Sequence, residues 1–372
     1  MTHIAFISGT RADYGKIRPY IDFLAKEQKR EVSVFITGMN MLKKYGSTFH
    51  FMQKDLKKIA KIVLDKSFKE SSSSQEMAHI IQKFDKFLKK EKIDFVFVHG
   101  DRPEVLAASS CAVLNNIPVC HIEAGDISGS VDELIRHATS KLSHKFLVAD
   151  EAAKNTLIQL GEDEKNIYIT GNSSLAYTIS PLTKKEKKLV QQFENYGILI
   201  YHPVTTLSKT DIKKEISKIM TALSRTKNDY VVILPNNDLG SDTILATYEE
   251  FKTNPKFHFF KSLSFEAFNY LLRNAKFLIG NSSCGIKEAP FYQTPVIDIG
   301  TRQKNRYNHL KLNNFYHIDS PDTLEETILQ IKQPKTKTIL TEPKVFFEKL
   351  HAVFTDEFFN CSTQKTFIKQ KK

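Results

Sequence analysis

The chain has 372 residues, of which 41% are hydrophobic and 26% are charged, which is enough apolar sequence to build two packed domains. No apolar run approaches the roughly 20 residues that a membrane-spanning helix needs, and residues 1–10 lack the basic start and long apolar stretch of a signal peptide, so we expect a cytoplasmic protein. The net charge of +12 comes from lysines spread over several segments without interleaved aromatic residues, so we expect neither a nucleic acid nor a membrane as partner.

Short apolar runs alternate with helical stretches along the first half of the chain. Several of these runs are apolar on consecutive residues, as strands buried on both faces require. The expected strands are residues 4–7, 32–36, 95–98, 119–122, 146–148 and 167–169. The expected helices are residues 16–28, 75–90, 104–114, 132–142 and 152–160. Strand–helix alternation of this kind predicts a parallel sheet that is covered on both faces.

The second half repeats the same alternation. Its expected strands are residues 198–201, 230–234, 258–260, 277–279 and 296–299. Its expected helices are residues 211–224, 242–251, 265–273, 285–292 and 323–331. Two such halves predict an α/β protein with two Rossmann-like domains.

The expected domain boundaries follow from this pattern. We expect an N-terminal domain over residues 1–175 and a C-terminal domain over residues 176–343, with residues 171–188, which hold Pro181 and a run of lysines, as the hinge. Residues 344–359 read as an amphipathic helix that packs back on the first domain. The basic tail from Lys365 to Lys372 is expected to be frayed.

Polar residues flanked by glycine follow nearly every expected strand. In doubly wound sheets, ligands bind outside the carboxyl ends of the strands. In the first half these positions carry residues 9–11, 99–102 and 123–126; in the second half they carry residues 202–203, 235–238, 281–283 and 300–302. The segment GNSSCGIKE at 280–288 opens a helix with small hydroxyl residues, and free N–H groups at a helix start suit a phosphate. The second half therefore predicts a nucleotide-diphosphate site, and the first half supplies acids for chemistry.

These strand-end segments also form a family pattern. GTRADYGK at 9–16, HGDR at 99–102, HIEAGD at 121–126, SVDELIRH at 130–137, HPVTT at 202–206, PNND at 235–238, GNSSCG at 280–285 and GTRQ at 300–303 resemble, in order, the motifs of the UDP-N-acetylglucosamine 2-epimerase family. Ala12 and Asp13 stand where the non-hydrolysing branch typically has Pro-Glu, so the chain resembles the hydrolysing branch, which makes N-acetylmannosamine for bacterial sialic acid synthesis.

The resemblance implies a fold and a chemistry. The fold would be of the glycosyltransferase-B type, with a nucleotide-sugar substrate in an interdomain cleft and a homodimer or homotetramer as the assembly. In the family, the proton at C2 of the sugar is removed while the nucleotide leaves from C1; this anti elimination gives 2-acetamidoglucal, which water then converts to the manno product. That chemistry needs a base, an acid and groups that stabilise the departing diphosphate.

The resemblance also assigns roles to residues. Asp101, Glu123 and Asp132 match the family's acidic trio, and His202 matches its site histidine, which would contact phosphate or protonate the leaving group. Arg11 and Lys16 would hold the diphosphate, and Arg136 and His137 would orient the acids. The remaining candidates are expected to bind the nucleotide or to line the cleft: Ser282, Ser283 and Gly285 at the phosphates, Glu288 at the ribose, and Asn236, Asp238, Ser241 and Arg302 more loosely.

Structural interpretations of some of these residues remain open. Asp101 could cap the helix that begins at Pro103, Asp132 could cap its own helix, and Arg136 could form an ordinary ion pair. The sugar could instead be a diacetylated trideoxy derivative, N,N'-diacetylbacillosamine, on UDP or GDP, and a glycosyltransferase on the same fold is a more distant alternative. The four cysteines have no zinc spacing, and GTR is not a GxGxxG loop, so we expect neither a metal nor a nicotinamide cofactor.

Overall fold

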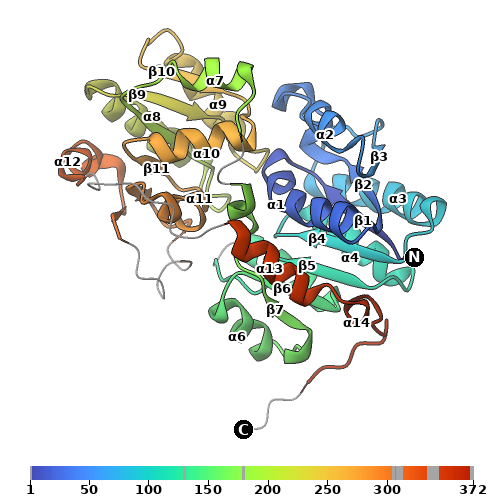
Figure 1. The fold of residues 1–372 in the computed structure, drawn as a ribbon. Helices are drawn as coiled ribbons and strands as arrows, with labels where there is room; N and C mark the ends of the chain where they lie inside the picture. The colour runs from blue at the N-terminus through green and yellow to red at the C-terminus, as the bar shows by residue number, and fades with distance from the viewer. Residues whose placement is uncertain are drawn as a thin grey trace. The chain divides into compact units, whose positions relative to one another are not determined.

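The computed structural model describes residues 2–128, 131–177, 181–303, 306, 313–332 and 343–368. The chain divides into two compact units (Figure 1). Unit 1 comprises Met1–Ala176 together with Pro343–Lys372, and unit 2 comprises Tyr177–Glu342. No helix among the described residues is long and apolar enough to cross a membrane.

Unit 1 is built on a seven-stranded sheet in which every pair of neighbouring strands is parallel. The order is β3-β2-β1-β4-β5-β6-β7, so the direction of winding reverses between β1 and β4. The strands are β1 His3–Ser8, β2 Glu31–Ile36, β3 Lys61–Leu64, β4 Phe95–His99, β5 Val119–Ile122, β6 Lys145–Val148 and β7 Ile167–Ile169. The helices are α1 Arg11–Asp22, α2 Phe49–Leu56, α3 Ser73–Glu91, α4 Pro103–Leu114, α5 Val131–Leu142, α6 Glu151–Gln159, α13 Pro343–Val353 and α14 Asp356–Phe359.

The two faces of this sheet are covered by different parts of the chain. On one face, α3 and α4 bury an apolar cluster that includes Phe84 and Val98. On the other face, the C-terminal helix α13 packs against α1 through the rings of Phe346 and Tyr20 (Figure 1), and the ring of Phe354 stands edge-on to that of Phe97 with 5.7 Å between centroids. Burial on both faces explains why strands such as β4 are apolar at consecutive positions.

Unit 2 repeats this architecture with a six-stranded parallel sheet in the order β10-β9-β8-β11-β12-β13. Its strands are β8 Tyr196–Ile200, β9 Asp229–Ile233, β10 Phe257–Phe260, β11 Leu278–Gly280, β12 Val296–Ile299 and β13 Phe315–Ile318. Its helices are α7 Lys184–Val190, α8 Lys209–Arg225, α9 Ser241–Glu250, α10 Phe265–Asn274, α11 Cys284–Lys287 and α12 Leu324–Gln330. The prediction of an α/β protein with two Rossmann-like units is confirmed.

Several local predictions are wrong for physical reasons. The first helix begins at Arg11 rather than Lys16, because Thr10 and Asp13 form a capping box. The lysine run assigned to the hinge is helix α7, which a second capping box starts at Thr183. The expected helix 285–292 breaks into α11 and a 3-10 turn, Ala289–Tyr292, because Pro290 lacks the N–H that a continuous helix would use.

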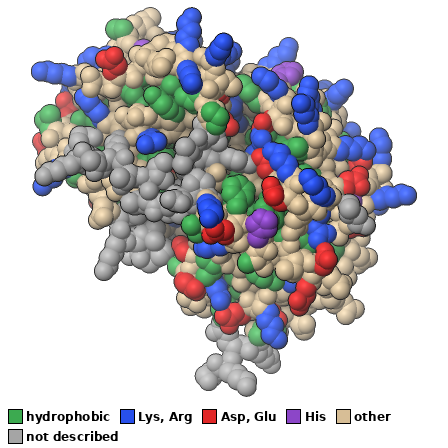
Figure 2. All heavy atoms as spheres, viewed as in Figure 1, with side chains coloured by type: hydrophobic (Ala, Val, Ile, Leu, Met, Phe, Trp, Pro, Cys, Tyr) green, Lys and Arg blue, Asp and Glu red, His purple; other side chains and the backbone are tan. Residues whose placement is uncertain are grey.

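The charge of the surface agrees with the dispersed lysines of the sequence. On the face shown in Figure 2, Lys and Arg side chains are scattered among Asp and Glu side chains rather than gathered in one stripe. Many lysines form exposed ion pairs, for example Lys89 with Asp85 at 2.8 Å. Pairs of this kind add little to stability, so these lysines serve mainly to keep the surface hydrated.

The tail is not frayed at Lys365, contrary to expectation. Its ammonium group forms an ion pair with Glu162 at 2.6 Å, and it donates to three main-chain carbonyl oxygens at the end of α5. Residues 369–372 lie outside the described residues. The segment that follows α14 is therefore part of unit 1 at least as far as Ile368, whose N–H donates to the carbonyl of Gly161 at 3.0 Å.

Candidate functional site

The loop after β1 is held by a carboxylate from the helix that it starts. Asp13 is buried, and it accepts hydrogen bonds from the N–H groups of Gly9 and Thr10, both at 2.9 Å, and from the Ser8 hydroxyl. Burial raises the pKa of Asp13, and the bonds to Ser8, Thr10 and Gly9 oppose that shift. The N–H groups of Gly9 and Thr10 are therefore already used within the loop. The Arg11 guanidinium lies 4.2 Å from the ring centre of Phe51.

Glu123 lies between two basic side chains at the carboxyl end of β5. Lys16 Nζ is 3.1 Å from each of its carboxylate oxygens, and His99 Nε2 is 3.5 Å from Oε2. Glu123 is only 6% exposed, and its main chain has a φ of +57°, which an L-residue rarely adopts. A buried acid with two basic neighbours and a strained main chain is typical of a functional position.

Asp101 follows β4, the strand that neighbours β5, and it contacts the guanidinium of Arg136 on α5. Arg136 is 1% exposed, and it also donates to the carbonyl of Asp126 at 2.9 Å. Asp101 is not the cap of α4, because Arg102 occupies the N-cap position without a side-chain hydrogen bond. The side chain of Asp101 remains 26% exposed, so it is open to solvent while its partner is not.

His121 fixes the main chain just before Asp101. Its Nε2 lies 2.8 Å from the carbonyl oxygen of Gly100, and its Nδ1 lies 3.0 Å from the hydroxyl of Ser140. Burial lowers the pKa of His121 to about 3, so the ring is neutral at physiological pH. A carbonyl only accepts, so Nε2 carries the proton and Nδ1 accepts from Ser140.

Helix α5 carries three of the predicted residues. Asp132 lies half-buried in its first turn, and Arg136 follows one turn later, so the two share a face of the helix. His137 Nε2 is 3.7 Å from Glu133, and burial lowers the pKa of His137. Residues 129–130, which precede the helix, lie outside the described residues, so the proposed cap at its start is not tested.

In unit 2, His202 is positioned by an asparagine that the sequence analysis did not single out as a ligand. Asn281 is fully buried; its Oδ1 accepts from the N–H of His202 at 2.7 Å, and its Nδ2 donates to the His202 carbonyl at 2.8 Å. The Asn281 carbonyl accepts in turn from Arg302 at 3.1 Å and from Gln303 at 2.8 Å. These bonds join the loops after β8, β11 and β12 at one edge of the sheet.

The turn after β11 is short and tightly packed. Gly280 has a φ of +133°, and a Cβ there would lie 1.9 Å from the carbonyl oxygen of Ile200. The N–H of Gly285 donates to the Ser282 carbonyl at 3.1 Å, so this N–H closes the turn. Ser282 and Ser283 are partly exposed and therefore accessible to a ligand. Glu288 is buried at the break between α11 and the 3-10 turn.

The loop after β9 holds the weaker candidates. Asn236 and Asp238 are half-buried, and Asp238 lies 4.0 Å from the Arg302 guanidinium. The Asp238 carbonyl accepts from the N–H of Ser241, which is buried at the start of α9. Asp238 and Arg302 therefore lie close together at the carboxyl edge of this sheet, as the sequence pattern suggested.

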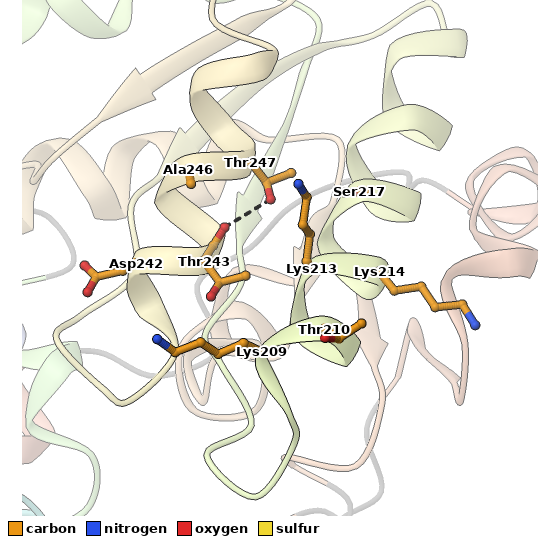
Figure 3. Close-up of a pocket in the computed structure, with 9 residues that line it drawn as sticks. All are labelled: Lys209, Thr210, Lys213, Lys214, Ser217, Asp242, Thr243, Ala246 and Thr247. Carbon is orange, nitrogen blue, oxygen red and sulfur yellow. Dashed lines mark hydrogen bonds between the residues drawn. The ribbon is translucent and has the colours of Figure 1, made fainter.

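A separate hollow of about 720 Å³ lies between α8 and α9. Figure 3 shows its lining residues, which are Lys209, Thr210, Lys213, Lys214, Ser217, Asp242, Thr243, Ala246 and Thr247. None of the predicted site residues lines it, and the Lys213 ammonium is already 3.6 Å from Glu250. Among the described residues, no group of three or more His, Cys, Asp or Glu side chains is arranged to hold a metal ion.

The sequence matches known proteins over most of its length. A model of the family described as UDP-N-acetylglucosamine 2-epimerase matches residues 23–337. A UDP-N-acetylglucosamine 2-epimerase of Neisseria meningitidis is 38% identical, with 82% of each chain covered. A UDP-N,N'-diacetylbacillosamine 2-epimerase (hydrolyzing) of Legionella pneumophila is 34% identical with the same coverage, and a polysialic acid biosynthesis protein of Escherichia coli is 31% identical, with 82% of this chain and 80% of that protein covered.

The fold matches solved structures as well. The UDP-GlcNAc 2-epimerase of Methanocaldococcus jannaschii, crystallised with UDP-GlcNAc and UDP, superposes with a TM-score of 0.78 over 94% of this chain and 99% of that one. The two sequences are 19% identical, so this likeness concerns the fold. It confirms the expected glycosyltransferase-B type of fold.

Proposed function

Since this chain belongs to the UDP-N-acetylglucosamine 2-epimerase family, we propose that it is a hydrolysing 2-epimerase that converts UDP-N-acetylglucosamine to N-acetylmannosamine and UDP. The single observation that carries this proposal is the pair of carboxylates at the ends of β4 and β5. Glu123 lies against Lys16 and His99, and Asp101 lies against Arg136. Two acids at neighbouring strand ends, each with its own basic partner, suit a reaction that moves protons on both faces of a sugar.

The proposed reaction has two steps. A carboxylate removes the proton from C2 as the bond between C1 and the diphosphate oxygen breaks, which releases UDP and leaves 2-acetamidoglucal. Water then adds across the double bond, with hydrogen to the opposite face of C2 and hydroxyl to C1, and the product is N-acetylmannosamine. Asp101, Glu123 and Asp132 would share the roles of base, acid and water positioner.

Unit 2 would hold the nucleotide. Ser282 and Ser283 would donate to the phosphates, Glu288 would accept from the ribose hydroxyls, and His202 would contact the diphosphate or protonate it as it leaves. The rigid link between His202 and Asn281 supports this assignment, because a leaving-group contact is worth most when its donor is already in place.

Two observations favour the hydrolysing branch. Asp13 stands at a position where the non-hydrolysing branch typically has glutamate, and its carboxylate fills the capping box of α1. The relative from Legionella pneumophila, at 34% identity, carries the word hydrolyzing in its name. N-acetylmannosamine would then feed the synthesis of sialic acid for a surface polysaccharide.

The sugar has one alternative that a specific observation favours. The Legionella relative acts, by its name, on UDP-N,N'-diacetylbacillosamine, and its identity to this chain is within four percentage points of the 38% of the Neisseria enzyme. The alternative keeps the reaction and replaces the 4-hydroxyl by an acetamido group and the 6-hydroxyl by hydrogen.

Parallel turnover assays test the proposal. Purified protein is incubated with UDP-N-acetylglucosamine or with UDP-N,N'-diacetylbacillosamine, without any acceptor, and NMR follows UDP and the free sugar. Release of UDP together with N-acetylmannosamine supports the first assignment, and turnover of the second substrate alone supports the alternative. A second incubation contains an added sugar acceptor, and transfer of an unchanged gluco-configured sugar to it would make the protein a glycosyltransferase instead.

A further inference from the structure

The segment after α14 lies along unit 1 in a defined path. The carbonyl of Thr363 accepts from His144 Nε2 at 3.1 Å, and the N–H of Ile368 donates to the Gly161 carbonyl at 3.0 Å. The ring of Phe367 covers Gly161 so closely that a Cβ there would be 2.2 Å from the ring. Three separate contacts therefore hold residues 361–368 against the carboxyl-terminal ends of α5 and α6.

Lys365 is the centre of this contact. Its Nζ donates to the carbonyls of Ser140, Lys141 and Ser143 at 3.0, 3.1 and 2.7 Å. The same group pairs at 2.6 Å with Glu162, whose side chain is 1% exposed. The last carbonyl groups of a helix have no hydrogen-bond donor inside the helix and carry partial negative charge. The Lys365 ammonium group supplies both the donors and the positive charge.

The end of α5 that Lys365 holds is linked to the loop that carries Asp101. Ser140, whose carbonyl bonds to Lys365, donates its hydroxyl to His121, and His121 donates to the carbonyl of Gly100. Gly100 is the residue before Asp101. The other half of α5 supplies Arg136, which contacts the Asp101 carboxylate itself.

We propose that residues 361–368 act as a strap and that Lys365 is a positioning residue for the reaction, because it fixes the helix that holds both the main chain and the carboxylate of Asp101. Lys365 touches no reacting atom in this scheme. The effect on turnover rests on the proposed function, whereas the effect on α5 does not.

Substitution of Lys365 tests the proposal. Lys365→Met keeps the aliphatic stem but removes the charge and the donors. We expect kcat to fall by about ten-fold with KM nearly unchanged, as a small misplacement of a catalytic group would cause. Lys365→Arg should restore most of the rate, since it donates from the same place. Lys344→Met is the matched control, because within the described part of the chain Lys344 pairs with an exposed residue, Glu348, on α13.

Hydrogen exchange separates positioning from general instability. In folded Lys365→Met protein, with an unchanged unfolding transition, the amides of α5 and of residues 100–102 should exchange faster, while those of β1 and β2 should not. Unchanged exchange in α5 and in residues 100–102 would overturn the proposal. Exchange is read without substrate, so it decides the question even if the wild-type protein turns over neither nucleotide sugar and the proposed function fails.

A double-mutant cycle tests the path through Ser140. Ser140→Ala removes the hydroxyl that bonds to His121 and leaves the carbonyl that bonds to Lys365. If both residues act through one path, the losses in kcat of Ser140→Ala and Lys365→Met should be clearly less than additive in free energy. Strictly additive losses would contradict the path.

Discussion

Lys16 Nζ lies 3.1 Å from both carboxylate oxygens of Glu123, although the two residues are 107 positions apart in the sequence. The side chains are 15% and 7% exposed, so this ion pair is largely withdrawn from water. The resemblance assigned Lys16 to the diphosphate of the substrate. The structure adds a second role, because Lys16 holds Glu123 in one orientation and compensates its charge.

We expect Lys16→Met to lower kcat by about a hundred-fold, because the buried Glu123 carboxylate then loses the ammonium group that contacts both of its oxygens. Lys26→Met is the control, since Lys26 also pairs with an acid, Asp22, but is half exposed and remote from Glu123. Steady-state kinetics on both variants checks this expectation. If the Lys16→Met enzyme has a normal kcat and only its KM is raised, Lys16 binds substrate but does not position Glu123 for catalysis.

The acids themselves should be indispensable for turnover but not for nucleotide binding. Asp101→Asn or Glu123→Gln should cut kcat by roughly a thousand-fold, the size of a lost acid or base, while UDP binds within about two-fold of the wild-type affinity. Calorimetry with UDP and turnover assays on the same protein give both numbers. Asp150→Asn, which alters only the cap of α6, should leave turnover unchanged. Near-normal rates in either acid variant would remove that residue from the mechanism.

Two glycines beside the acids should differ sharply in their tolerance of alanine. Gly125 and Gly100 have almost the same φ, +82° and +81°. An alanine held in this left-handed conformation would cost about 1–2 kcal/mol of stability at either position. A Cβ on Gly125 would also lie 2.2 Å from the Ala153 carbonyl oxygen, whereas Gly100 faces open space. Gly125→Ala should therefore unfold at a much lower urea concentration than Gly100→Ala. Equal midpoints would show that the loop around Gly125 relaxes away from α6.

Acid should weaken the fold through His121. Its pKa is about 3 in the folded protein against the ordinary value of 6.5, so between these values the unfolded chain binds a proton that the folded chain does not. The free energy of unfolding therefore falls as pH drops from 6.5 towards 3, by up to about 1.4 kcal/mol per pH unit from this one group. His121→Gln should make this slope shallower. The measurement is urea unfolding at a series of pH values, and an identical slope in the variant would exclude His121 as its source.

The sequence predicted most strands of both sheets, including the edge strands β7 and β10. Buried strands such as β4 carry an unbroken apolar run, here residues 95–98, and that pattern is unmistakable. The edge strands β3 and β13 were missed because each is partly exposed and mixes polar with apolar residues. Helix α7 was missed because a lysine-rich surface helix has no strong apolar stripe, although its Thr183–Glu186 capping box is visible in the sequence.

Strand ends also pointed to the candidate site, since Glu123 and His202 follow apolar runs directly and Asp101 stands two residues after β4. Contacts between residues far apart in the sequence could not be predicted, because no local pattern links Arg136 to Asp101 or Lys365 to the end of α5. The sequence could have indicated Asn281 and His99 as site residues, because each stands at the end of a buried strand within a family motif. Their roles became apparent only once the neighbouring loops were placed.

Deuterium incorporation tests the central claim most directly. The protein is incubated with UDP-N-acetylglucosamine in deuterated water, and NMR follows C2 of the sugar and the fate of the nucleotide. The proposed mechanism predicts free UDP and free N-acetylmannosamine that carries solvent deuterium at C2. Formation of UDP-linked N-acetylmannosamine without release of UDP, or a product that keeps its original hydrogen at C2, would contradict it.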